Sequence, residues 1–533
     1  MYRLTRSCGS AWNASSSAAG SRSRSLSYRT EIPSKESVIR DFNEYSLLNQ
    51  PFNARYFEWT HGDYLGSPMD IHTRTRAESP LISRNNVGMG FLVLNSMYTG
   101  ISQVTALYRR LADLETNVYK RFVVLTSMSR NCFSHGIHPV EVQLFKEALQ
   151  RLCRHENGAV LYQTVLRALD DYISNVCDLS YLIQSYKKPL VVYANGMTGG
   201  FGACLVSLAN FSACHKHSHL NYNNLELGTP LLGGQSYVMA MLRGSLGEYL
   251  ALTGATLTGN DLVWAGIVKR FISPDAIEVI QLTAERLTEM PEKETEFQLQ
   301  EHFLPLDAKY SLERLEWLIH EHFNRPSVAG IVRSLERGVP AKKLRSHSSV
   351  GEEAARKWEM ETLDALTRRT TSAPDIAEAT LQLIRRVKAY KLEVLKTLEI
   401  SPKRWNELQQ FAHVPPASGA DHASCAVLHS IQSEVLLESL QLEAASWFTW
   451  LGGVLKVPVE ELWSRSRFSL HPFTPCYRSG FALSSLPALR RLHPDFDART
   501  GSDHDAVRMK RMCERWSDDF LQRELLLMKR ILA

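Results

Sequence analysis

The sequence lacks several features that mark common kinds of protein site. It has no loop of the GxxxxGK type, which argues against a P-loop nucleotide-binding protein. Its nine cysteines include no CxxC pair, and their number is odd. Such a pattern argues against a disulfide framework and favours buried or incidental thiols, so stability must come from packing.

The first thirty residues contain no acid, although they contain five arginines. They are rich in Ser and Ala, and no continuous apolar run is present. This composition predicts a mitochondrial transit peptide over residues 1–30, and the alternative is a disordered tail. The formal charge of +5 minus these five arginines leaves the remaining chain near neutrality, so contact with a polyanion requires a local patch.

One uncharged run, from Pro189 to Cys214, is long enough to span a bilayer. Its glycines, together with Asn195 and Asn210, favour a buried strand, loop and helix instead. We therefore predict no membrane contact.

Strand and helix patterns alternate through the middle of the chain. Short apolar runs at 91–94, 122–125 and 189–193 indicate buried strands, and helical periodicity fills the intervals between them. This alternation predicts an α/β fold with parallel pairing. We divide the chain into a transit peptide (1–30), an N-terminal extension (31–85), a core (86–285), a helical region (286–401) and a mostly helical C-terminal extension (402–533).

The clearest helix of the helical region begins at Ser372, with Pro374 in its first turn. Its apolar stripe consists of Ile376, Leu383, Val387, Tyr390 and Val394. The opposite face carries Arg385, Arg386, Lys388 and Lys391. We interpret this cationic face as solvated, and the alternative is a site for a partner.

An acid-free segment lies between Leu462 and Leu492 and mixes arginines with aromatic residues. Such a mixture suits RNA, whose backbone is anionic and whose bases stack on aromatic rings. The alternative is a loop that packs its aromatic residues on the core. The candidate RNA or protein contacts are Arg465, Arg467, Phe468, Tyr477, Arg478, Arg490 and Arg491.

The stretch from Lys188 to Ile272 contains glycine-bearing motifs in a definite order. They are Gly199-Gly200-Phe201-Gly202, Leu227-Gly228-Thr229-Pro230-Leu231-Leu232-Gly233-Gly234 and Ala265-Gly266-Ile267-Val268. In this order they resemble the core of the enoyl-CoA hydratase/isomerase (crotonase) family, and Gly244 to Tyr249 resembles its 3-hydroxyisobutyryl-CoA hydrolase branch. The resemblance covers about residues 86 to 400. It implies a spiral of ββα units, followed by a helical region and an added helical extension.

In that family two backbone N–H groups stabilise the oxyanion of the thioester. The resemblance puts His135 at one donor position, with Ile137 where relatives have glycine. It puts Phe201 at the second donor position, within the glycine run. A phenyl group at this position is expected to obstruct the acyl pocket.

The positions of the catalytic acids hold no acid. The resemblance assigns Asn224 to the catalytic Glu and Leu231 to the catalytic Asp of the hydrolases, and Cys204 to the Glu of the hydratases. Neither Asn nor Leu can accept a proton or form an acyl intermediate. Each such loss costs about 100- to 10,000-fold in rate, so we predict an inactive relative. Glu226 lies two residues after Asn224, the position assigned to the catalytic Glu.

The run Cys214-His215-Lys216-His217-Ser218-His219 puts imidazoles at alternate positions. Alternate residues of a strand share a face and could converge on a metal ion. The spacing matches no standard zinc site, so surface histidines are favoured and no metal is predicted.

The resemblance leaves three functions open. A hydrolase-like protein of this branch belongs to the small subunit of the mitochondrial ribosome, and we favour such a structural role in the matrix, with ribosomal proteins and rRNA as partners. The first alternative is an active thioesterase of valine breakdown that uses Glu226, Cys204 or His135. The second is a relative that retains a vestigial coenzyme A site without turnover; no other cofactor is expected.

Overall fold

The computed structural model describes residues 81–86, 88–129, 131–153, 159–272, 303–304, 312–347, 350–411 and 419–465. The predicted transit peptide and nearly all of the N-terminal extension lie outside these ranges. The fold below therefore concerns the core, the helical region and the first half of the C-terminal extension.

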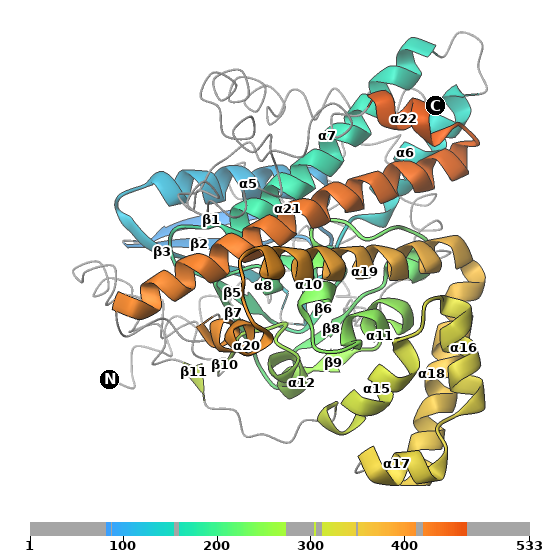
Figure 1. Cartoon of the computed structure of the whole chain (residues 1–533). Helices are drawn as coiled ribbons and strands as arrows, with labels where there is room; N and C mark the ends of the chain where they lie inside the picture. Colours follow the sequence, from blue (N-terminus) through green and yellow to red (C-terminus); the bar gives the residue numbers. More distant parts are fainter. Residues whose placement is uncertain are drawn as a thin grey trace, which may run out of the picture.

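A seven-stranded sheet forms the centre of the core (Figure 1). Its order is β1-β2-β3-β5-β7-β10-β11, in which β2, β3, β5, β7 and β10 run parallel and the two outer strands pair antiparallel. The strands are β1 (Leu81–Asn86), β2 (Gly88–Leu94), β3 (Lys120–Ser127), β5 (Leu190–Ala194), β7 (Phe211–Cys214), β10 (Arg270–Ile272) and β11 (Phe303–Leu304).

The apolar runs explain these central strands. The three predicted runs fall on β2, β3 and β5, and the residues of these runs are buried on both faces of the sheet. Near-continuous Val, Leu and Phe suits a parallel sheet, because neither of its faces meets water. The predicted α/β class with parallel pairing is confirmed.

A second, smaller sheet has the order β4-β6-β8-β9. Its strands are β4 (Cys132–Ser134), β6 (Met197–Gly199), β8 (His219–Asn221) and β9 (Leu257–Thr258). The first three strands run parallel. Because parallel strands end at the same edge, the loops that follow β4, β6 and β8 come together.

Helices of the core surround the sheets. They are α5 (Ile101–Thr116), α6 (Pro139–Leu152), α7 (Ala159–Gln184), α8 (Phe201–Ser207), α9 (Asn224–Leu227), α10 (Gln235–Met241), α11 (Leu246–Thr253) and α12 (Gly259–Trp264). The helical periodicity predicted between the first two strands is confirmed by α5, whose apolar stripe is buried.

The helical region and the described part of the C-terminal extension pack on this core (Figure 1). Their elements are η2 (Glu313–Leu315), α15 (Glu316–Phe323), α16 (Val328–Arg337), α17 (Ala341–His347), α18 (Glu352–Ser372), α19 (Pro374–Thr397), α20 (Pro402–Phe411), α21 (Gly419–Leu455) and α22 (Val459–Arg465). Among the described helices, none is long and apolar enough to cross a membrane.

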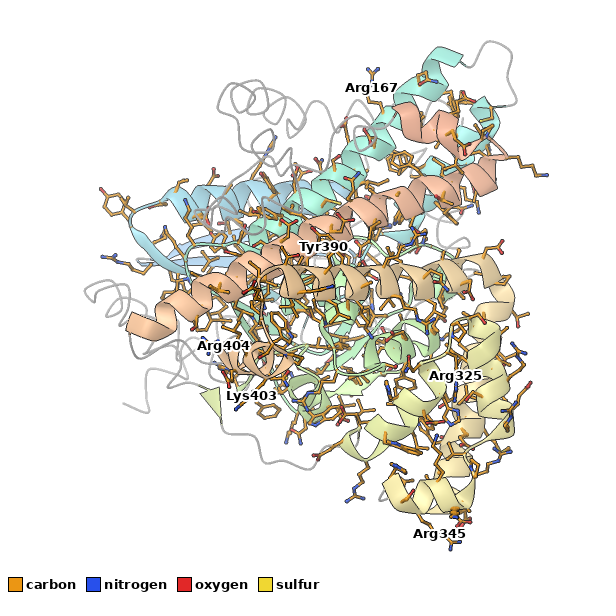
Figure 2. All side chains as sticks on the ribbon, viewed as in Figure 1. Arg167, Arg325, Arg345, Tyr390, Lys403 and Arg404 are labelled. Carbon is orange, nitrogen blue, oxygen red and sulfur yellow. The ribbon has the colours of Figure 1, made fainter. Side chains whose placement is uncertain are left out.

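The long helix α21 lies against α19, α10 and α7. Figure 2 shows Tyr390 of α19 where α19 and α21 run together, and its hydroxyl donates to Glu434 Oε1 at 2.6 Å. The apolar residues of α21 join the same hydrophobic cluster as those of the core. The start of the C-terminal extension is therefore packed into the fold.

The interpretation of the α19 cations as a solvated face is wrong for three of the four. Lys388 Nζ lies 2.6 Å from Glu248 Oε2, and Lys391 Nζ donates to the Ala240 carbonyl at 2.7 Å. Arg385 donates to the carbonyls of Phe323 and Arg325, whereas Arg386 is exposed. Long cationic side chains can reach past their own helix, and these reach carbonyls and a carboxylate of neighbouring elements.

Candidate functional site

The two predicted oxyanion segments meet in the structure. Gly136 has a φ of +91°, and a Cβ there would lie 2.8 Å from both the Gly199 carbonyl oxygen and the Phe201 nitrogen. Such a close approach, in a backbone region that L side chains rarely adopt, requires glycine. The loop after β4 and the glycine run after β6 are therefore in direct contact, as the resemblance implied.

The His135 backbone N–H is already bonded within the chain. It donates to the Met97 carbonyl at 2.6 Å, and the neighbouring Gly136 carbonyl accepts from Thr99 N–H, also at 2.6 Å. The His135 ring is buried beside Tyr98, with ring centroids 5.4 Å apart. An N–H that stabilises an oxyanion must point at the substrate, and this one points at the backbone.

Phe201 is the first residue of α8, and its side chain is fully buried. A Cβ on Gly233 would lie 2.3 Å from Phe201 Cε2 and 2.9 Å from Val176 Cγ1. The phenyl ring therefore fills the space between Gly233 and α7 and belongs to the hydrophobic core. The predicted obstruction of an acyl pocket stays a prediction.

The two predicted carboxylate positions are also engaged within the chain. Asn224 opens α9, and its Nδ2 donates to the Pro230 carbonyl at 3.0 Å. The Leu231 side chain is buried, and its carbonyl accepts from Trp447 Nε1 of α21 at 3.1 Å. The amide helps to close the loop, the leucine packs in the core, and neither side chain can accept a proton at neutral pH.

The three groups that could replace the missing acids in an active thioesterase differ in solvent accessibility. Cys204 is fully buried in α8, and burial raises its pKa well above the ordinary value, so the thiol stays protonated and unreactive. Glu226 is half-exposed, and its Oε2 lies 3.4 Å from Arg369 NH2 of α18. Of Glu226, Cys204 and His135, Glu226 is the one with solvent access.

A buried carboxylate that sequence reasoning missed lies next to the glycine pair. Glu443 of α21 accepts from Gly234 N–H at 2.7 Å, and from Ser236 N–H and Oγ at 2.6 and 2.7 Å. These N–H groups belong to the start of α10, where a helix favours negative charge. Burial raises the pKa of Glu443 to about 7, and the hydrogen bonds from Ser236 and Gly234 oppose that rise.

The sequence did hold a signal for Glu443. The residue lies three positions after Leu440 and four before Trp447, both of which are buried. An acid on an apolar stripe at helical spacing is rarely buried unless it has partners, so it marks a polar contact.

Glu141 plays a similar part beside the His135 loop. It is buried in α6, and its Oε2 accepts from Ile101 N–H, the first of α5, at 2.8 Å. Burial raises the pKa of Glu141 to about 7, and the backbone hydrogen bond from Ile101 opposes the rise. Burial also lowers the pKa of His138 to about 3, so its imidazole is neutral at neutral pH.

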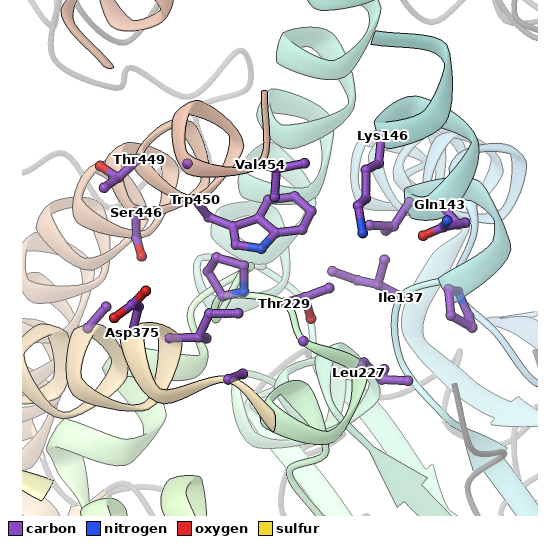
Figure 3. Close-up of a pocket in the computed structure, with 18 of the residues that line it drawn as sticks. Ile137, Gln143, Lys146, Leu227, Thr229, Asp375, Ser446, Thr449, Trp450 and Val454 are labelled. Atoms are coloured by element: carbon purple, nitrogen blue, oxygen red, sulfur yellow. The ribbon is translucent and has the colours of Figure 1, made fainter. Parts of the chain in front are cut away.

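A cavity of about 590 Å³ lies between the core, α19 and α21 (Figure 3). Figure 3 shows Ile137, Thr229 and Trp450 around it, and Lys146 and Asp375 supply charged groups. Within the described part of the chain, its lining includes none of the predicted catalytic or oxyanion positions, which are His135, Phe201, Cys204, Asn224 and Leu231. The cavity borders the predicted site without containing it.

The histidine run lies at the turn between β7 and β8. His215 is buried, whereas His217 and His219 are exposed, and the rings of His215 and His217 are 5.8 Å apart. In the described residues, no three His, Cys, Asp or Glu side chains are grouped so that they could hold a metal ion.

The predicted RNA or protein contacts fall at the limit of the described residues. Arg465 ends α22, and its side chain is not among those described. The others, Arg467, Phe468, Tyr477, Arg478, Arg490 and Arg491, lie outside the described residues. These contacts stay predictions.

Comparison with known proteins matches residues 93–401 to the family described as Enoyl-CoA hydratase/isomerase, which is more than half of the 533 residues. The chain belongs to the enoyl-CoA hydratase/isomerase family. The match confirms the predicted resemblance, which was drawn over about residues 86 to 400, and with it the crotonase fold.

Three similar proteins have different names. The chain is 32% identical over 174 residues to "3-hydroxyisobutyryl-CoA hydrolase-like protein 5" of Arabidopsis thaliana, covering 30% of this chain and 41% of that one. It is 28% identical over 186 residues to "3-hydroxyisobutyryl-CoA hydrolase, mitochondrial" of Danio rerio, covering 34% and 46%. It is 26% identical over 167 residues to "Small ribosomal subunit protein mS47" of Arabidopsis thaliana, covering 31% and 41%.

The aligned part thus spans less than half the length of each of these relatives. Among solved structures, a carnitinyl-CoA dehydratase from Mycobacterium thermoresistibile is 19% identical, with a TM-score of 0.48, covering 79% of this chain and 96% of that one.

Proposed function

We propose that the chain is a structural component of the small subunit of the mitochondrial ribosome, built on an inactive 3-hydroxyisobutyryl-CoA hydrolase-like fold. In this role it contacts ribosomal proteins and rRNA in the matrix and turns over no thioester. The proposal places its function on the surface and in the extensions.

This proposal rests on the residues found at the two positions where the hydrolases have catalytic acids. Asn224 and Leu231 are engaged in closing a loop and in packing, and neither can act as base or nucleophile. Each such loss lowers the rate by about 100-fold or more, so we expect negligible turnover when neither position holds an acid.

Two further observations support a structural role. The C-terminal extension bonds to the site through Glu443 and Trp447, so it is joined to the segment that carries the catalytic Asp in the hydrolases. In addition, one similar protein is named as a small ribosomal subunit protein.

The alternative is an active mitochondrial 3-hydroxyisobutyryl-CoA hydrolase. It is supported by the 590 Å³ cavity, and by Glu226, which has solvent access next to cavity-lining Leu227. The same cavity supports a vestigial coenzyme A site without turnover. A thioesterase requires Glu226, whereas vestigial binding does not.

Sedimentation of the endogenous full-length protein tests the structural role. A lysate of isolated mitochondria is separated on a sucrose gradient, and the protein is followed together with known small-subunit proteins. We expect it to co-sediment with the small subunit and to shift when magnesium removal dissociates the particles. Sedimentation solely as a free protein contradicts the proposal.

A further inference from the structure

The amino-terminal ends of the parallel strands form an edge opposite the loops that follow β4, β6 and β8. Lys120 and Arg121 begin β3, and Lys187 and Lys188 precede β5, with Pro189 between Lys188 and the first residue of the strand. Tyr119 lies in the turn between α5 and β3. We call these five residues the cationic edge.

The register of the sheet brings these cations together. Val123 of β3 pairs with Leu190 of β5, and Val123 N–H donates to the Pro189 carbonyl at 2.9 Å. Arg121 precedes Val123 by two residues, and Lys188 precedes Leu190 by two. Because neighbouring strands lie about 4.8 Å apart, the backbones of Arg121 and Lys188 lie next to each other on one edge of the sheet.

Hydrogen bonds hold this edge in a fixed shape. Lys188 Nζ donates to the Leu114 and Asn117 carbonyls at 2.9 and 2.6 Å. The Lys188 carbonyl accepts from Asn210 Nδ2 at 2.9 Å, and Lys187 N–H donates to Glu115 Oε1 at 2.7 Å. A surface that is already ordered loses little conformational entropy when it binds a partner.

Two acids lie near these cations. The Glu115 side chain is buried, and Asp113 lies 4.0 Å from another cation, Arg110. Further along the same edge, Lys269 precedes β10 and donates from Nζ to the Ala209 carbonyl at 2.8 Å. Burial lowers the pKa of Lys269 to about 8, so the cations of the edge come from the starts of two strands, β3 and β5.

The edge also carries an exposed aromatic ring. Tyr119 is 81% exposed, and its backbone N–H donates to Asn117 Oδ1 at 2.9 Å, which fixes the turn. A tyrosine that leaves most of its ring in water, directly beside a group of cations, is placed to stack on a base.

We propose that the cationic edge binds the phosphate backbone of RNA, with Tyr119 stacked on an unpaired base. RNA fits better than an anionic membrane, because polybasic membrane contacts lie on amphipathic helices or beside spanning helices, and this edge consists of strand ends. The proposal rests on the proposed ribosomal function for its setting, and its test is independent of sedimentation.

Binding of a labelled, mixed-sequence single-stranded RNA to the purified full chain tests the edge. Affinity is measured by anisotropy at several KCl concentrations for the parent and for Arg121→Glu/Lys187→Glu. We expect at least about 10-fold weaker binding and a fall of about 1.4 in the salt slope, about 0.7 for each lost phosphate contact. Tyr119→Ala, at an exposed position, is expected to weaken binding about 5-fold or more.

The matched control is Lys357→Glu/Arg368→Glu, which makes the same charge change at exposed positions of α18. The proposal predicts parental RNA affinity for this control. Equal loss in both double variants shows a general charge effect and overturns the proposal. Binding to phosphatidylserine vesicles without binding to RNA also overturns it.

The two proposals fail in different ways. If the protein co-sediments with small subunits but Arg121→Glu/Lys187→Glu binds RNA like the parent, the cationic edge is wrong and the ribosomal role stands. If the variant loses RNA binding but the protein sediments free of subunits, the edge stands and the ribosomal role is wrong.

Discussion

The two ends of the parallel sheet use their polar groups in opposite ways. At the carboxyl-terminal end, the His135 N–H, the Asn224 amide and Glu443 bond to the chain itself. At the amino-terminal end, Arg121 and Lys187 stand at the surface beside an exposed Tyr119. The same sheet thus engages its polar groups within the fold at one end and exposes basic and aromatic side chains at the other.

The largest expected effect concerns Phe201, which the resemblance puts at the position of a family glycine. If the ring is core, Phe201→Ala destabilises the protein by about 4 kcal/mol through lost burial and a cavity. Denaturant unfolding measures this loss, and Tyr119→Ala is the control, with a change below about 0.5 kcal/mol. A variant of unchanged stability shows that Phe201 is not a core residue.

The next effect concerns Glu443. Replacing it by Ala leaves the N–H groups of Gly234 and Ser236 buried without an acceptor, which is expected to cost about 3 kcal/mol. Glu460→Ala, at an exposed position of α22, is the matched control. An equal free energy of unfolding for the two variants contradicts the view that Glu443 stabilises the packing of the C-terminal extension on α10.

The pH dependence of stability gives a smaller effect with a definite sign. The folded pKa of Glu443 is about 7 and the unfolded one about 4.3, so its protonation favours the folded state. That stabilisation is complete below about pH 4.3 and is lost as pH rises through 7, a fall of about 2.5 kcal/mol between pH 5 and 8.

Glu443→Gln removes this contribution, so the variant is compared with the parent across the pH range. The comparison matters because His138, with its lowered pKa, contributes the opposite slope below about pH 6.5. Chemical unfolding at each pH gives the difference between the two proteins. A parent and variant with parallel pH profiles contradict a buried, titrating Glu443.

The smallest expected effect belongs to the cationic edge. Arg121→Glu/Lys187→Glu should change the free energy of unfolding by less than about 1 kcal/mol, because surface charges contribute little to stability. The same variant is expected to lose most of its RNA affinity. A large loss of stability would show that these residues serve the fold, as those at the opposite end do.

Much of the fold could be predicted from the sequence, because it depends on local pattern. The runs at 91–94 and 122–125 are buried on both faces, so they are apolar without interruption and easily assigned to strands. The resemblance, which rests on an ordered set of motifs, assigned Asn224, Leu231 and Phe201 to site positions, and this assignment stays a prediction. The structure adds that all three are engaged within the chain.

The parts that could not be predicted depend on contacts between distant segments. Glu443 meets Gly234 across 209 positions of sequence, and no local spacing predicts such a pairing. Lys388 and Lys391 looked solvated because helical periodicity assigns a side chain to a face but says nothing of how far it extends. The cationic edge joins residues 119–121 and 187–188, which only the register of β3 and β5 brings together.

The proposed loss of catalytic activity is tested most directly by thioester hydrolysis. Purified full-length protein is incubated with 3-hydroxyisobutyryl-CoA, and release of coenzyme A is compared with buffer and with a Glu226→Gln variant. We predict that the parent and the variant both release coenzyme A at the rate of buffer. Hydrolysis by the parent that Glu226→Gln abolishes would contradict the account and establish an active thioesterase.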